Sequence, residues 1–245
     1  MGLFDPHMDQ IHAYLEQRSE QPDVSTVDLR QLSTAWPSGD RNNLVLSSDT
    51  AVELGSPKTA STSFLAWTDR DDRLSSGRLT LVGPDIKGEN RELVPFGKAV
   101  LASVSGFDEN NSYDRFREME MVKYDIRLTG YMMRAVSQYQ REWSRISKKA
   151  VADGFSLSFL GRALYEKLTA LPYVNAVEIV FITASAEDVR RIQPIAEEVR
   201  TLTGAMNKMV EEMDFDCSSC DYRPVCDSVS ELRAMKKAMQ KQKKR

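Results

Sequence analysis

The three cysteines of this chain all fall within one window of ten residues, Cys217-Ser-Ser-Cys220-Asp-Tyr-Arg-Pro-Val-Cys226. Cysteine thiolates bind metals and iron–sulfur clusters, and the C-x2-C spacing lets two of them hold one metal or cluster. An odd number of cysteines cannot pair off within one chain. The pattern therefore predicts a metal site at Cys217, Cys220 and Cys226, and the alternative is a reduced structural turn.

The identity of the metal is left open by these residues. Three thiolates are one ligand short of a closed structural zinc site or of a fully protein-ligated [4Fe–4S] cluster. Thiolates alone do not separate iron from zinc, so both remain. The fourth ligand could come from a partner, from solvent or from a nearby carboxylate, and an incomplete cluster could bind something at its open iron. The nearby carboxylates are Asp214, Asp216, Asp221 and Asp227, whereas His7 and His12 lie far upstream.

The composition is typical of a soluble globular protein, with 41% hydrophobic and 28% charged residues in a chain of 245. No apolar run reaches the length of about 18 residues that a membrane span needs. The N-terminus shows no secretory signal, so reduced cysteines predict a cytoplasmic protein. The net charge of −3 argues against general nucleic-acid binding.

Basic residues gather at the C-terminal end of the chain. The segment 231–245 holds seven Lys or Arg residues and a single Glu. Leu232, Met235 and Met239 recur at helical spacing, which is typical of an amphipathic helix. We expect the cysteine segment and this basic tail to contact a larger enzyme complex or a second copy of the chain, with a frayed, solvated terminus as the alternative.

Helical and strand patterns alternate along the chain and predict a mixed α/β (α+β) domain, in which one mixed sheet is flanked by helices. Short apolar runs predict strands at 43–46, 79–82, 93–104 and 174–183. Apolar residues at helical spacing predict helices at 129–153, 160–168 and from 186 to the cysteines, with Ser185 as a cap and Pro194 near the first turns or at a kink. The polar segment 55–77 predicts a loop or short elements.

The predicted organisation has four parts. They are an N-terminal arm (1–42), the α/β domain (43–213), a three-cysteine metal segment (214–230) and the basic tail (231–245).

The helix expected at 129–153 carries apolar residues on one side and basic residues on the other. At about 100° per residue, its four basic side chains fall within about 60° of one another. They are Arg134, Arg141, Arg145 and Lys148. Such a stripe could bind phosphates, although a charged helix face is usually only solvated. No Walker loop and no G-x-G-x-x-G opens a helix, so neither familiar nucleotide motif is present.

Residues 143–155, Trp-Ser-Arg-Ile-Ser-Lys-Lys-Ala-Val-Ala-Asp-Gly-Phe, resemble a motif of the nickel-dependent acetyl-CoA synthase family, the β subunit of the CO dehydrogenase/acetyl-CoA synthase complex. Glu53-Leu-Gly-Ser-Pro-Lys58 and Val82-Gly-Pro-Asp85 resemble two further motifs of that family. The segment 174–199 follows the family's strand-then-helix order and leads into the C-x2-C. The resemblance implies the middle domain of that enzyme joined to the start of its metal-cluster domain.

The resemblance also implies roles for the cysteines. Cys217 and Cys220 take the C-x2-C positions of the family's [4Fe–4S] cluster, and Cys226 takes a third position. The fourth cluster cysteine and the C-G-C segment that would bind the distal nickel have no counterpart here. We therefore expect that the chain is not a nickel acetyl-CoA synthase on its own.

Coenzyme A handling is implied in the same way, with Trp143 as a contact and Arg145 and Lys148 as phosphate partners. Arg141 and Arg134 of the basic stripe complete the set of candidate residues. On a helix, however, Trp143 would lie on the apolar face, opposite Arg145. A core tryptophan is therefore the alternative.

The function predicted from the sequence is that of an iron–sulfur accessory subunit, or a CoA- or acyl-CoA-handling subunit, of an anaerobic multiprotein enzyme complex. One alternative is an enzyme that uses a three-cysteine [4Fe–4S] cluster with an open iron for acyl or one-carbon transfer. Another is a structural or interaction domain held together by zinc. The sequence leaves open whether the chain is an enzyme.

Overall fold

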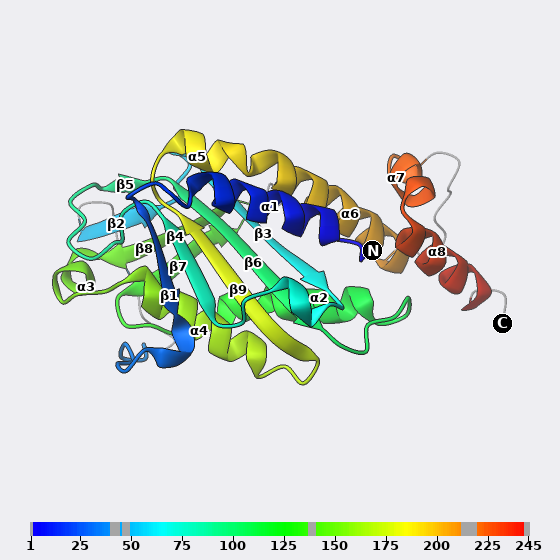
Figure 1. The fold of residues 1–245 in the computed structure, drawn as a ribbon, viewed down its shortest axis with the longest axis horizontal. Helices are drawn as coiled ribbons and strands as arrows, with labels where there is room; N and C mark the ends of the chain where they lie inside the picture. Colours follow the sequence, from blue (N-terminus) through cyan, green and yellow to red (C-terminus); the bar gives the residue numbers. More distant parts are fainter. Residues whose placement is uncertain (1, 40–44, 46–49, 137–140, 212–219, 243–245) are drawn as a thin grey trace.

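The computed structural model describes all of the chain except residues 1, 40–44, 46–49, 137–140, 212–219 and 243–245. Within the described residues, helices and strands combine in a mixed α/β fold that contains two mixed sheets (Figure 1). The predicted fold class is confirmed, except that the one expected sheet is two. No helix in the described part of the chain is both long and apolar enough to cross a membrane.

The larger sheet has five strands in the order β1-β4-β9-β6-β3. The β4–β9 and β6–β3 pairs are parallel, and the β1–β4 and β6–β9 pairs are antiparallel. Nearly every residue of its central strands is buried, as expected for strands covered on both faces. The strands are β1 (Val24–Asp28), β3 (Ser61–Thr68), β4 (Arg78–Val82), β6 (Phe96–Val104) and β9 (Val174–Ile182).

Helices cover both faces of this sheet (Figure 1). On one face lie α1 (Asp5–Arg18), α5 (Ala186–Arg191) and α6 (Gln193–Glu211), and on the other lies α4 (Leu157–Thr169). Ser185 caps α5 by accepting a 3.0 Å hydrogen bond from the Asp188 N–H, as predicted. The expected break near Pro194 is also present, since α5 ends and α6 begins just before it.

The second sheet has four strands in the order β5-β2-β8-β7. Its strands are β2 (Ala51–Leu54), β5 (Leu93–Val94), β7 (Tyr131–Val136) and β8 (Glu142–Ser147). The short helix α3 (Lys148–Ala152) follows β8 directly. The predicted helix at 129–153 is therefore wrong, because this segment forms a β-hairpin and a single short helix.

The burial pattern of β8 explains this error. Residues alternate between buried and half-buried along the strand, which is the period of two expected for a strand. The buried positions include Glu142 and Ser144, so polar residues occupy inward positions and hide the alternation of apolar residues. The apolar residues of the segment 129–153 happen to recur at helical spacing, and this spacing led to the helix prediction.

The loop expected at 55–77 is also incorrect, because β3 lies within it. Seven of its eight residues are buried and the first is half-buried. Thr62, Ser63 and Thr68 are among the buried ones, so polar residues again disguise a central element. The expected strands at 79–82, 93–104 and 174–183 and the helix at 160–168 are confirmed by β4, β5 with β6, β9 and α4. The expected strand at 43–46 lies largely outside the described residues.

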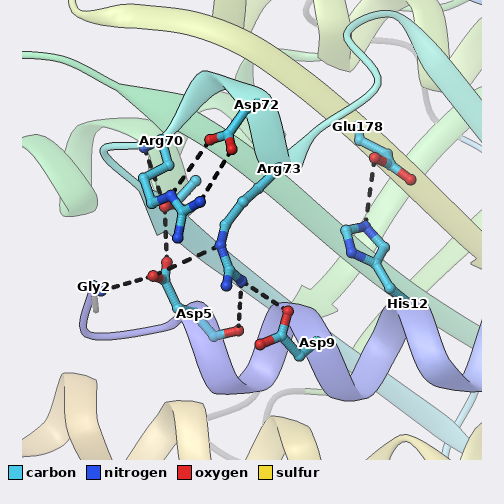
Figure 2. Close-up of polar contacts among 9 residues, drawn as sticks. Gly2, Asp5, Asp9, His12, Arg70, Asp72, Arg73 and Glu178 are labelled. Carbon is cyan, nitrogen blue, oxygen red and sulfur yellow. Dashed lines mark hydrogen bonds and ion pairs between the residues drawn. The ribbon is translucent and has the colours of Figure 1, made fainter.

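The N-terminal helix packs on the larger sheet rather than forming an arm. Asp5 is fully buried and accepts 2.8 Å hydrogen bonds from the Thr68 hydroxyl and the Gly2 N–H. Arg73 donates a 2.8 Å hydrogen bond to Asp9 on the same helix (Figure 2). One turn further along, His12 reaches Glu178 of β9. These contacts hold α1 against the rest of the domain.

The C-terminal helices α7 (Arg223–Ser228) and α8 (Ser230–Gln242) pack near the end of α6, and α2 (Ser112–Met121) lies close by. The predicted helix in the basic tail is confirmed by α8. Its residues Leu232 and Met235 are buried within the chain, at 0% and 3% exposure. These two apolar residues are therefore covered by this molecule and are not left for a partner.

Candidate functional site

Two of the sequence motifs, Glu53–Lys58 and Trp143–Phe155, meet on the second sheet. β2 and β8 pair antiparallel, with Glu53 opposite Arg145 and Leu54 opposite Ser144. Arg145 Nε and Nη2 each lie 2.7 Å from Glu53 Oε1. Both side chains are largely shielded, at 14% and 7% exposure, so this ion pair fixes the guanidinium in place.

Trp143 and Arg145 lie on the same face of β8. The two residues are separated by two positions, and the Arg145 guanidinium carbon lies 5.4 Å from the centre of the Trp143 ring. This distance is within the range of a cation–π contact. The prediction that Trp143 lies opposite Arg145 is therefore wrong, because a strand, not a helix, carries them. Both half-buried side chains belong to one surface.

The glycine of the first motif is required by the approach of β8. Gly55 has a φ of +62°, and a Cβ at this position would overlap the carbonyl oxygen of Glu142. Its N–H donates a 2.9 Å hydrogen bond to the Val94 carbonyl of β5. Ser61 joins the same point, because its hydroxyl donates to the Glu142 carbonyl at 2.9 Å. The turn after β2 is thereby held against the start of β8.

The inward face of β8 carries an ion pair between the two sheets. The Glu142 carboxylate, 1% exposed, pairs with the ammonium of Lys98 on β6, 5% exposed. It also accepts a 3.2 Å hydrogen bond from the Ser63 hydroxyl of β3. Burial, with the nearby Glu142 carboxylate, raises the pKa of the Tyr131 phenol well above its ordinary value. Trp143 therefore directly follows Glu142, whose side chain points to the opposite, buried face of β8 and forms this ion pair.

The third motif, Val82–Asp85, holds the end of β4 and the start of α4. Asp85 accepts hydrogen bonds from the Leu157 N–H at 2.8 Å and from the Ser156 hydroxyl at 2.5 Å. Gly83 has a φ of +109°, and a Cβ there would overlap the backbone of Ala184. Asp85 thereby links the end of β4 to the start of α4.

The three predicted cations whose side chains the structure describes do not form one stripe. Lys148 is exposed and lies 3.5 Å from Glu92. Arg141 donates to the Ser56 and Thr59 carbonyls at 2.9 and 3.4 Å. Arg134 stands in β7, where the pairing with β8 shifts register between Met133 and Ala135. The structure brings Arg145 to Trp143 and separates Lys148 and Arg141 into different surroundings.

The predicted metal ligands are described in part. Cys217 lies outside the described residues, Cys220 is half-buried, and Cys226 is buried in α7 at 6% exposure. Cys220 and Cys226 line one small cavity, along with the basic residues Lys208, Arg223 and Lys236. Among the residues that the structure describes, no three His, Cys, Asp or Glu side chains are grouped so as to hold a metal ion. The metal site therefore stays a prediction.

Both histidines serve contacts within the domain. His7 Nε2 lies 3.3 Å from Glu198 of α6, and His12 Nε2 lies 3.5 Å from Glu178. Burial lowers the pKa of His7 below its ordinary value, although Glu198 acts in the opposite direction.

Some residues of the site were missed by sequence reasoning. Lys98 and Ser63 belong to segments read only as a strand and a loop. Arg190, which lines a cleft with Lys58 and Arg141, belongs to a helix read only for its apolar positions. Lys58 was seen as the last residue of a motif, but nothing in the sequence places it near Arg141, 83 positions away. Pairing of β2 with β8 brings the segments of Lys58 and Arg141 close to each other.

Comparison with known proteins identifies the family of this domain. The profile of the CO dehydrogenase/acetyl-CoA synthase complex beta subunit matches residues 38–189, a segment that includes all three motifs. The chain belongs to this family. The matched residues end before the cysteines, so the family match does not extend to the predicted metal ligands.

Two curated relatives are subunits of acetyl-CoA decarbonylase/synthase complexes. Subunit beta 2 from Methanosarcina thermophila is 27% identical over 175 residues, which are 69% of this chain and 36% of that protein. Subunit beta from Methanopyrus kandleri is 26% identical over 157 residues, which are 64% of this chain and 32% of that protein. The chain therefore spans about a third of the length of these relatives.

Proposed function

We propose that this chain is a subunit of an anaerobic multiprotein enzyme complex and that it binds coenzyme A or an acyl-CoA at the Trp143 face of β8. The observation that carries the proposal is the meeting of two family motifs, with the Trp143 ring and the Arg145 guanidinium on one face. Family membership and the names of the relatives support the assignment to a complex.

The side chains of this face suit the parts of a CoA molecule. An indole offers a flat apolar surface on which an adenine ring can stack. Arg145 is oriented by Glu53 and lies against the ring, so it adds donors beside the stacking surface. Lys148 is about half exposed, and its 3.5 Å contact with Glu92 is long, which suits exchange of that carboxylate for a phosphate.

We expect Trp143→Ala to weaken CoA binding by about 5- to 150-fold, because loss of a base-stacking aromatic costs about 1–3 kcal/mol. Isothermal titration calorimetry of CoA would measure it. Trp36→Ala is the matched control, since Trp36 is also half-buried but lies against Phe155 and Phe159 instead. Equal CoA affinity in Trp143→Ala and the parent protein would overturn the assignment.

We also propose that Cys217, Cys220 and Cys226 hold a [4Fe–4S] cluster, with zinc as the alternative. The donor chemistry supports this, because two of the thiols share a cavity lined by three basic side chains. The basic side chains around this cavity suit the negative charge of a thiolate-ligated cluster. Such a cluster would supply electron transfer or, at an iron without a thiolate, a site for a ligand.

Anaerobically purified protein is expected to be brown, with iron and acid-labile sulfide in comparable amounts. Cys220→Ser and Cys226→Ser should each lower the iron content, because each removes one of three protein ligands. Metal analysis and a visible spectrum measure this, and a variant lacking all three thiols gives the level of adventitious iron. Colourless protein with one zinc per chain would contradict the cluster and support the zinc alternative.

A further inference from the structure

A polar cleft lies beside the turn that carries the first motif. It has a volume of about 480 Å³ and is formed by the turn 57–62, by Arg141 just before β8, and by residues of α5 and α6. Three basic side chains line it, Lys58, Arg141 and Arg190. They come from three separate parts of the chain, so the cleft exists only in the folded domain.

Within the described part of the chain, no acidic side chain balances the charges of this cleft. None of the described residues that line it is Asp or Glu. Neither the Lys58 ammonium nor the Arg190 guanidinium makes a hydrogen bond or ion pair with the part of the chain that the structure describes. Elsewhere, Arg145 is paired with Glu53 and Arg78 with Glu178. Unbalanced positive charge in a cleft concentrates anions there.

Two backbone carbonyls hold the Arg141 side chain in place among these three cations. Its Nη1 donates to the Ser56 carbonyl at 2.9 Å and to the Thr59 carbonyl at 3.4 Å. A guanidinium has five N–H donors, so further donors stay available after these two bonds. The carbonyls hold the side chain without neutralising its charge. Thr59, Thr62 and Gln193 add uncharged donors to the wall of the cleft.

We propose that this cleft binds a small ligand that carries a diphosphate group, whose oxygens accept hydrogen bonds from Lys58, Arg141 and Arg190. Arginine matches phosphate geometry through paired N–H donors, and lysine adds a mobile point charge. Three unbalanced cations suit the several negative charges of a diphosphate better than a single monoanion. The assignment stands on the cleft alone and does not need CoA to bind at Trp143.

The test is calorimetric titration of the intact chain with inorganic pyrophosphate, then with ADP and CoA. Arg190→Ala and Lys58→Ala are each expected to weaken pyrophosphate binding by about tenfold, the lower end for a hydrogen bond to a charged group. Both residues are exposed, so melting temperatures should stay near that of the parent. The affinity should also fall as salt rises.

Arg191→Ala is the matched control, because it removes the same charge from the same helix. Arg191 pairs with Glu187 at 3.6 Å and does not line the cleft. Equal weakening by Arg190→Ala and Arg191→Ala would reduce the effect to net charge and overturn the site, as would absence of pyrophosphate binding. Competition between pyrophosphate and CoA would identify CoA as the source of the diphosphate, and binding without competition would point to another diphosphate ligand. Unchanged CoA binding in Trp143→Ala removes the proposed stacking site but leaves this cleft standing.

Discussion

Lys98→Met is expected to lower the free energy of unfolding by about 3–5 kcal/mol, because it leaves the Glu142 carboxylate buried without its cation. Glu142 is 1% exposed, so water cannot replace the lost ammonium. The remaining hydrogen bond from Ser63, at 3.2 Å, only partly satisfies the carboxylate. Urea unfolding followed by circular dichroism would measure the change.

Two further variants separate the charge effect from a loss of packing. Lys98→Met combined with Glu142→Leu is expected to recover most of the stability, since a buried pair replaced as a unit is often close to neutral. Lys149→Met is the exposed control, because Lys149 pairs with Asp153 on the surface at 83% and 53% exposure. Its effect should stay within about 1 kcal/mol. A Lys98→Met protein as stable as Lys149→Met would show that the buried pair does not hold the sheets together.

The chain around Lys98 and Glu142 shows how far the sequence alone predicts the fold. The strands of the larger sheet at 79–82 and 174–183 were predictable, because most of their residues are apolar and β-branched or aromatic residues are frequent among them. β8 and β3 were not, because the polar residues Glu142, Ser144 and Ser63 occupy buried positions, two of them as partners in a hydrogen bond between Ser63 and Glu142. In the sequence alone, a buried polar residue cannot be distinguished from a surface residue as long as its partner is unknown.

The candidate site, too, could be predicted from the sequence only in part. The motifs at 53–58 and 143–155 were recognisable as local strings, so their family could be inferred from the sequence. The contact between the two motifs could not be inferred from the sequence, because Glu53 and Arg145 are 92 positions apart and are brought together by strand pairing. The error on Trp143 and Arg145 followed directly from the choice of helix over strand, since the side-chain period decides which residues share a face.

Glu178→Gln is expected to lower the free energy of unfolding at pH 7 by about 1.5–3 kcal/mol, the usual contribution of hydrogen bonds to a charged group. Glu178 is fully buried in β9. Its carboxylate accepts from Arg78 at 2.7 Å and from the Ser75 N–H at 3.1 Å, and His12 of α1 lies 3.5 Å away. Glutamine keeps the shape but gives up the charge, so the hold on α1 and on the turn before β4 weakens.

This effect should depend on pH in a defined direction. Burial acts to raise the pKa of Glu178, but His12, the Ser75 N–H and Arg78 outweigh it and hold the pKa below its ordinary value of 4.5. A carboxyl with a lowered folded-state pKa contributes stability above its unfolded-state pKa, and this contribution is lost as pH falls through the folded-state pKa. The stability difference between the parent and Glu178→Gln should therefore be full at neutral pH and shrink below about pH 4.5.

Urea unfolding of both proteins across the acid range would test this. Glu166→Gln is the matched control, because Glu166 pairs with Arg162 at 2.7 Å but is 57% exposed. Its effect should be at most about 1 kcal/mol, as for other surface pairs. Removal of the Glu178 charge alone should also loosen α1, which hydrogen exchange would detect as faster exchange of the Asp5–Arg18 amides. A parent–variant difference that stays constant from neutral to acid pH would show that the Glu178 charge does not stabilise the fold.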